Sequence, residues 1–276
     1  MTTRPILFSV LAIGFARILP AAAAGGAPCA DEIVRRSVAA NQADWKAAPA
    51  YSFTERDVES HRGGVKTVKI YRTLMLFGSP YRRLIGVDDR PLSKQQDARE
   101  RSKLKAEATR RSRQSPAGRA RRIAKYAQER KQDQSMLLEM AAGFQYKLVG
   151  DDKLDGHDVW VLEASPRPGY APKTRETKVL TSMRGKLWID KARYQWVKVE
   201  AEVFRPVTYG MFIAKVGPGT KFELEQAPVA DNVWMPTHFS TTVRASVLGF
   251  SDNSTDDEGY RDYKPNQSAL LEAMAE

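Results

Sequence analysis

Apolar and polar residues alternate with a period of two over most of the chain outside one central segment. The clearest runs cover residues 195–204 and 238–248, where Val199 and Val203, or Phe239 and Val243, alternate with charged or hydroxyl side chains. One apolar face and one polar face are typical of antiparallel strands. Further strands are predicted in 51–56, 65–77, 81–87, 145–150, 159–164, 186–189, 210–216, 220–226 and 260–263.

The central segment instead predicts two helices, over 94–112 and 117–142. Both stretches are rich in Ala, Arg, Lys, Glu, Gln and Leu, which favour helices. Ser93 with Gln96 fits a capping box before the first helix, and Pro116 suits the first turn of the second. Leu104 is the first helix's single large aliphatic residue, so we expect that helix to lie largely in solvent. Met136, Leu137, Met140 and Phe144 share a face of the second helix and should pack on the body.

A third helix is predicted near the N-terminus, after the first apolar run of the chain. Its residues Val34, Val38 and Trp45 should point toward the core. Together these patterns predict an α+β fold that is mainly antiparallel β. We expect one large curved sheet with a few helices packed on it.

The N-terminus has the pattern of a secretory signal peptide. Arg4 precedes a short apolar run, and small residues end at Ala24, the preferred cleavage site. We therefore predict a signal peptide over 1–24, a single domain over 25–268 with 93–142 as a basic helical insertion, and a tail over 269–276. This organisation predicts export to the bacterial periplasm. Cys29, the single cysteine, offers lipoprotein anchoring as an alternative, although Pro28 before it is a poor fit to such a site.

Positive charge is concentrated in the insertion. The chain has a formal net charge of +11, and residues 99–131 hold thirteen basic residues against three acidic ones. Because the rest of the mature chain is close to neutral, this segment is the predicted contact for an anionic partner or membrane surface. The candidate contact residues are Arg110, Arg111, Arg113, Arg119, Arg121 and Arg122.

Catalytic, metal and nucleic-acid signatures are weak in this sequence. His61, His157 and His238 have no metal-ligand spacing, and no G-x-S-x-G motif occurs. Tyr126 is the only aromatic residue within the basic run, which argues against a base-stacking surface. We expect no catalytic residue, metal, cofactor or nucleic-acid partner.

Two stretches carry a resemblance to a known family. They are Gly78–Ser93 and the run Arg184–Asp190, with the pattern G-x-x-aromatic-I-D, leading into Trp196–Glu202. With the order of elements, they resemble the LolA/LolB-like lipoprotein-carrier superfamily, in particular a bacterial branch of outer-membrane lipoprotein-sorting-protein-like sequences. The resemblance implies an unclosed β-barrel with helices over its concave side and an apolar cavity for acyl chains.

Three function classes therefore remain open, and the third, an enzyme of unrecognised type, has no convergent catalytic set to support it. The first is a non-enzymatic carrier or chaperone for lipid or lipoprotein acyl chains in the bacterial envelope. The alternative is an envelope sensor or adaptor of similar fold that docks an anionic partner, an envelope protein or a membrane surface through its basic helices. For the carrier, the candidate cavity residues are Val197, Val199, Val203, Phe222, Leu224, Phe239 and Val243.

Overall fold

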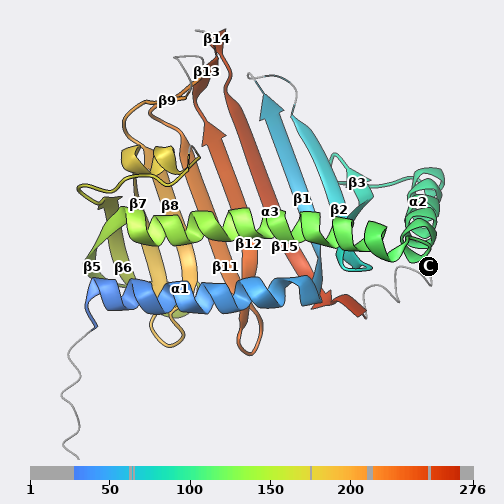
Figure 1. Cartoon of the computed structure of the whole chain (residues 1–276), viewed down its shortest axis with the longest axis horizontal. Coiled ribbons are helices and arrows are strands. Elements are labelled where there is room, and N and C mark those ends of the chain that lie inside the picture. Colours follow the sequence, from blue (N-terminus) through green and yellow to red (C-terminus); the bar gives the residue numbers. More distant parts are fainter. Residues whose placement is uncertain are drawn as a thin grey trace, which may run out of the picture.

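An 11-stranded antiparallel sheet forms the centre of the protein (Figure 1). The computed structural model describes residues 28–61, 64, 66–174, 176–209, 214–247 and 250–267. The strands follow the order β4-β3-β2-β1-β15-β12-β11-β8-β7-β6-β5. Their bounds are β1 Tyr51–His61, β2 Thr67–Leu76, β3 Ser79–Val87, β4 Arg90–Pro91, β5 Phe144–Leu154, β6 His157–Pro166, β7 Met183–Asp190, β8 Trp196–Val203, β11 Lys221–Ala230, β12 Val233–Val243 and β15 Ser254–Pro265.

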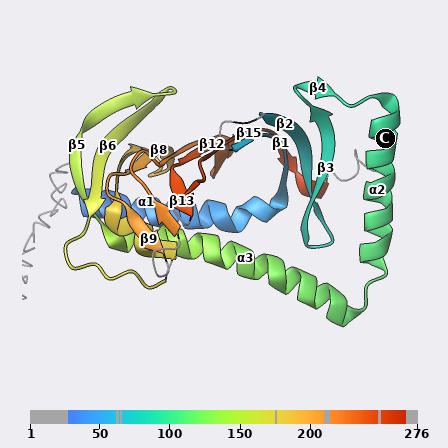
Figure 2. The ribbon, with the colours of Figure 1, turned by 90° about the horizontal axis from the view of Figure 1, so that it is seen from above.

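Within the described residues, three α-helices accompany the sheet: α1 (Ala30–Ala47), α2 (Lys94–Ser112) and α3 (Pro116–Gly143). Figure 2 shows that the sheet is curved, that α1 and α3 run across one of its faces, and that α2 stands beyond β3 at one end. The predicted class, mainly antiparallel β with a large unclosed sheet and a few packed helices, is confirmed. The predicted signal peptide lies outside the described residues.

The helix ends follow the predicted local chemistry. Ser93 caps α2, and its side chain and that of Gln96 form the complete capping box. Ser115 caps α3 by accepting a hydrogen bond from the Gly118 N–H, and Pro116 lies in the first turn. The two predicted helices therefore begin and end within a residue of the observed ones.

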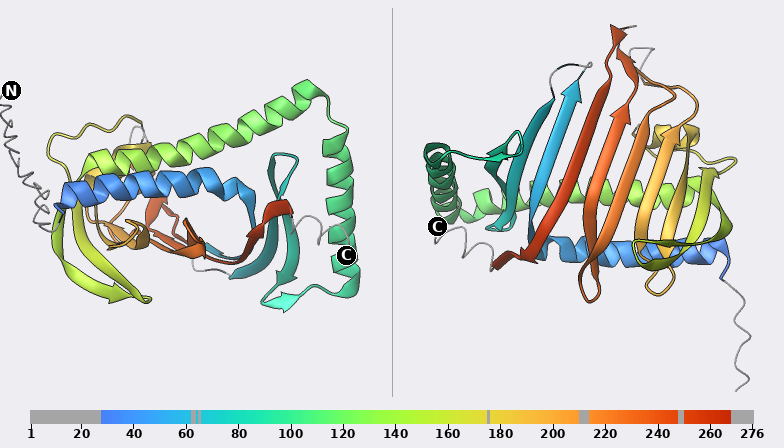
Figure 3. Two further views of the ribbon diagram at one scale, coloured as in Figure 1. Left: turned by 90° about the horizontal axis from the view of Figure 1, so that it is seen from below. Right: turned by 180° about the vertical axis from the view of Figure 1, so that it is seen from behind.

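α2 lies largely in solvent as expected, but it also has a buried side that the sequence analysis did not predict. Leu104 is completely buried and packs with Ala108 of α2 against Leu74 and Leu76 of β2. Side chains alternate across a strand, so Met75 of β2 points the other way, toward α3. The insertion thus holds β2 between two helices, with α2 on one side and α3 on the other (Figure 3).

The main core lies between α1, the C-terminal part of α3 and strands β5–β8. Ile33 and Val34 of α1 and Phe144 are buried there, and Leu137 and Met140 pack against the cluster as predicted for their helix face. Val38 also packs against this core. Trp45 differs from its prediction, because it is half-buried at the end of α1, outside this cluster. The side chain of Met136 lies outside the described residues.

Smaller elements complete the fold. A 4-stranded sheet in the order β14-β13-β10-β9 lies at one end of the large strands (Figure 1). Its strands are β9 Val207–Tyr209, β10 Ala214–Val216, β13 Ala245–Val247 and β14 Phe250–Ser251, and two 3-10 helices cover η1 Ala48–Ala50 and η2 Glu176–Ser182. Among the described helices, none combines the length and apolarity needed to cross a bilayer.

Candidate functional site

The predicted cavity residues do not surround a single open cavity. Val199 and Val203 are buried in the main core, and Phe222 and Leu224 pack against it. The strand register places Leu224 opposite both Val199 and Phe239, so these three share the sheet face that carries the helices. Phe239 and Val243 are half-buried farther along this face. Over β7 and β8 the face is therefore occupied by packed side chains.

Val197 corrects the predicted alternation. Trp188 pairs with Lys198 and Ile189 pairs with Trp196, so β8 carries one extra residue at Val197. Such a β-bulge shifts the side-chain alternation by one position. Val197 consequently belongs to a separate cluster with Val159 and Trp234, while Trp196 and Val199 share the main core.

A hollow of about 620 Å³ lies between the end of α1, the middle of α3 and β2. We call it the α3 cleft. Its lining residues are Trp45, Lys46, Pro49, Met75, Gly78, Ile123, Tyr126, Ala127, Arg130, Lys131, Gln134 and Asn266. Three elements that are distant in sequence thus supply an apolar and aromatic wall with basic residues beside it.

Backbone geometry and one amide fix the β2 side of the α3 cleft. Asn266 accepts a hydrogen bond from the Met75 N–H at 2.7 Å and donates to the Met75 carbonyl oxygen at 2.8 Å. Gly78 adopts a φ of 87°, and a Cβ there would lie 3.0 Å from Cδ1 of Ile123. A side chain at position 78 would therefore crowd the Ile123 side chain and would be strained at this positive φ, which glycine adopts at no steric cost.

Arg130 joins the two helices of the α3 cleft. Its guanidinium lies 4.6 Å from the ring centre of Trp45 and 5.7 Å from that of Tyr126, and it donates to the Trp45 carbonyl oxygen. Stacking of this kind uses the planar cation to hold aromatic walls together. Lys46 and Lys131 are exposed and have no ion-pair partner within the described part of the chain. The cleft thus presents uncompensated positive charge beside apolar walls.

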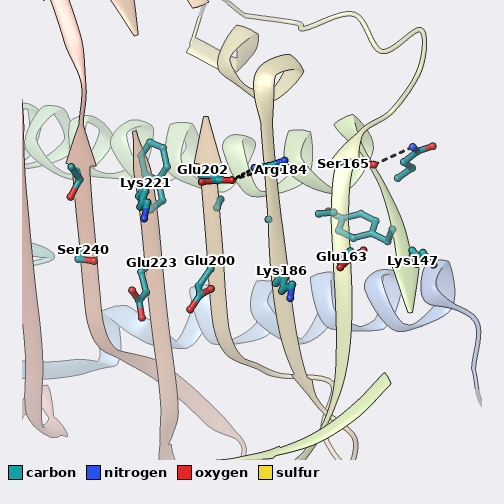
Figure 4. A pocket seen from close by; sticks show the side chains of 17 residues that line it. Lys147, Glu163, Ser165, Arg184, Lys186, Glu200, Glu202, Lys221, Glu223 and Ser240 are labelled. Atoms are coloured by element: carbon teal, nitrogen blue, oxygen red, sulfur yellow. Dashed lines mark hydrogen bonds and ion pairs between the residues drawn. The ribbon is translucent and has the colours of Figure 1, made fainter. Parts of the chain in front are cut away.

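A larger hollow of about 1000 Å³ lies on the opposite face of the sheet, and eight of its seventeen lining residues are charged, while Phe222 is among the others. Figure 4 shows its labelled side chains in front of the strands, with α1 and α3 behind them. One row crosses six strands in register: Lys147, Glu163, Lys186, Glu200, Glu223 and Ser240. A row of mixed charges of this kind favours a polar, solvated surface over an acyl-chain cavity.

Beside this row, Glu223, Glu225 and His238 bring three ligand-type atoms within 4.8 Å of one another. An ammonium group already lies at the two carboxylates, because Lys198 Nζ is 2.5 Å from Glu223 and 3.4 Å from Glu225. Burial lowers the pKa of Lys198, but hydrogen bonds to Glu223 and Glu200 outweigh burial and raise that pKa above its ordinary value. The charged ammonium therefore competes with any metal ion there. The sequence signal that could have found this group is the Glu-x-Glu alternation on a strand.

Two of the six arginines predicted to contact an anionic partner are structural. Arg111 is buried and donates to the carbonyl oxygens of Leu76, Ser79 and Pro80. Arg122 donates to the Phe77 carbonyl oxygen at 3.1 Å and to Ser79 Oγ at 2.7 Å. Both were predicted from charge density alone, which does not reveal which side of a helix is packed. Arg110, Arg113, Arg119 and Arg121 are exposed as a contact role requires.

Sequence reasoning missed most of the α3 cleft. Its signal was present in Tyr126 and Arg130, four residues apart on one helix face and therefore adjacent. The partners across the cleft, Trp45 and Met75, could be found only once α1 and β2 were placed beside α3.

Comparison with known proteins gives structural matches only. Neither the protein-family models nor the curated proteins contain a match to this chain. A LolA superfamily protein from Nitrosomonas europaea has 11% identity and a TM-score of 0.34, covering 86% of this chain and 94% of that one. A domain assigned to outer-membrane lipoprotein sorting from Vibrio parahaemolyticus has 12% identity and a TM-score of 0.35, covering 84% and 92%. A chain of the MucA/MucB complex from Pseudomonas aeruginosa has 11% identity and a TM-score of 0.23, covering 85% and 98%.

Proposed function

We propose that the mature chain is an exported, non-enzymatic carrier or chaperone of the bacterial envelope that holds lipid or lipoprotein acyl chains in the α3 cleft. The observation that carries this proposal is the composition of the cleft, which has Trp45, Met75, Ile123 and Tyr126 in its wall. A volume of about 620 Å³ falls within the range of small-molecule sites.

The energetics of such a site need little polar recognition. Each methylene removed from water contributes about 0.8 kcal/mol, so an acyl chain gains affinity from burial alone. Lys46 and Lys131 lie beside the apolar wall and lack ion-pair partners in the described residues. They favour a ligand with an anionic end over a neutral one.

Two exposed alanines of α3 provide a matched test. Ala127 lines the α3 cleft, and Ala124, one turn away, does not. Ala127→Trp should fill the cleft, so that the acyl chain of a fatty acid buries fewer methylenes there. Its affinity, measured by displacement of a fluorescent fatty-acid probe, should fall by at least about 10-fold. Ala124→Trp should leave the probe affinity unchanged, and both variants should melt near the parent's temperature because neither position is packed.

The location of the site is tested by a third variant. If the ligand instead lies along the strands predicted from the sequence, Phe239→Ser weakens binding and Ala127→Trp does not. The carrier proposal fails if the parent shows no probe binding at micromolar concentration.

A further inference from the structure

The end of the molecule formed by α2 and the start of α3 presents a row of cations to solvent. We call it the basic end face, and in Figures 1 and 2 it is the side of α2 turned away from the sheet. Its exposed residues are Arg99, Lys103, Arg110, Arg113, Arg119 and Arg121.

The direction of this face follows from the packing of α2. Leu104, Ala108 and Arg111 form the buried side of the helix. With 3.6 residues per turn, Arg99, Lys103, Arg110 and Arg113 lie on the opposite side. A helix of 19 residues is about 28 Å long, so the cations are spread along one straight edge.

Most of the charge on the basic end face is uncompensated. Lys103 pairs with Glu100, and Arg110 pairs with Glu107. Arg99, Arg113, Arg119 and Arg121 have no ion-pair partner in the part of the chain that the structure describes. Glu100 and Glu107 are turned inward, with side chains only 14% and 19% exposed, so the outermost groups are cations.

We propose that the basic end face docks the protein on an anionic lipid surface. The α2 residues that separate its cations are small or polar, such as Ser102, Ala106 and Thr109, and all three are exposed. Specific protein interfaces usually centre on buried aromatic or other apolar anchors, which these residues do not provide. A lipid bilayer needs no such anchor, because laterally mobile anionic headgroups adjust to any row of positive charge.

Docking on lipid is a role beyond carriage of a ligand, and the basic end face and the α3 cleft meet on α3. Arg121 of the basic end face and Tyr126 of the α3 cleft are both on α3, five residues apart. That separation is about 8 Å along the helix axis. A protein docked by this face therefore holds the α3 cleft close to the lipid surface from which an acyl chain would come.

Vesicle binding tests the proposal with two variants that remove the same charge. The first is Arg99→Gln/Arg113→Gln/Arg121→Gln on the basic end face. The control is Lys147→Gln/Lys186→Gln/Lys221→Gln, which changes three exposed lysines on the charged face of the sheet. Sedimentation with vesicles of phosphatidylglycerol and phosphatidylcholine measures the partition of each protein.

Each cation near an anionic surface changes the partition about five-fold, so the first variant should lose binding on the order of 100-fold. The control should lose less than about three-fold, since its charges lie away from the contact. Parent binding should vanish on pure phosphatidylcholine and fall steeply as salt rises from about 0.05 to 0.3 M.

Equal losses in both variants, or no parent binding to anionic vesicles at low salt, would overturn the docking proposal. Fatty-acid probe binding without vesicles separates it from the carrier proposal. The Arg99→Gln/Arg113→Gln/Arg121→Gln variant should retain the parent's probe affinity, because none of its three residues lines the α3 cleft.

Discussion

At the scale of single residues, Arg111 is a cation that stabilises the fold although it belongs to a solvent-facing basic segment. Its guanidinium donates to the Leu76 and Ser79 carbonyl oxygens at 2.8 Å each, and it pairs with Glu107. Hydrogen bonds from Arg110 and Arg111 lower the pKa of the Glu107 carboxyl to about 2. A buried ion pair is favourable only when further hydrogen bonds satisfy it, and the carbonyl oxygens of the β2–β3 turn do so here.

Arg111→Met should therefore lower the free energy of unfolding by about 3 kcal/mol, since it leaves buried carbonyl oxygens without their donor and leaves Glu107 with Arg110 alone. Arg113→Met is the matched control, because Arg113 is exposed two residues away and should change stability by less than about 0.5 kcal/mol. Urea unfolding measures both. Similar values for the two variants would show that the contacts of Arg111 contribute nothing to the fold.

Val197 shows where residue-level prediction from the sequence stops. Alternation correctly placed Val199 and Val203 on the helix-bearing face, but it also placed Val197 there. The bulge depends on how β8 pairs with β7, and apolar residues on both sides of it hide the change of face. The face on which Val197 lies is set by how β8 pairs with β7. The residue pattern of a single strand gives no information about that pairing.

At the scale of elements, local chemistry predicted helix ends better than helix packing. The boundaries of α2 and α3 follow from Ser93, Gln96, Ser115 and Pro116, all of which act on neighbouring residues. The buried side of α2 was missed because its stripe consists of Leu104, a small Ala108 and a charged Arg111. In that stripe an arginine stands where an apolar residue is expected, and it is buried because it donates hydrogen bonds to backbone carbonyl oxygens. A hydrophobic pattern cannot identify such a buried arginine.

Leu104→Ala should consequently cost about 3 kcal/mol of stability, since it opens a cavity against Leu74 and Leu76. The same change at Leu138 of α3, which is 43% exposed, should cost less than about 1 kcal/mol. Denaturant unfolding of the two variants compares them directly. If both changes cost little, α2 does not cover the core of β2 and the insertion is a solvated appendage as its composition predicts.

At the scale of the whole molecule, the strand order joins distant parts of the chain. The last long strand, β15, lies between β1 and β12, so it connects the sheet of the first hundred residues to that of the second half. The alternation of apolar and polar residues identified most strands, but it does not reveal the order in which the strands pair in the sheet. The α3 cleft depends on this order too, since it needs α1, β2 and α3 brought together around Asn266 just after β15.

The central place of β15 is tested by one glycine substitution and its matched control. Gly259 pairs with Arg56 of β1 on one side and with His238 of β12 on the other. Proline removes a ladder donor and is tolerated in sheets only at edges or bulges, so Gly259→Pro should cost more than about 3 kcal/mol.

Gly150 supplies the control, because it lies in the edge strand β5 at a register shift and a Cβ added to it would meet no other atom within 4 Å. Gly150→Pro should cost less than about 1 kcal/mol and keep a single cooperative transition. Thermal unfolding followed by circular dichroism compares the two. If β15 joins the two halves of the sheet, Gly259→Pro should split the single unfolding transition into two or abolish it. If both variants unfold alike, the two halves are held together by the helices instead.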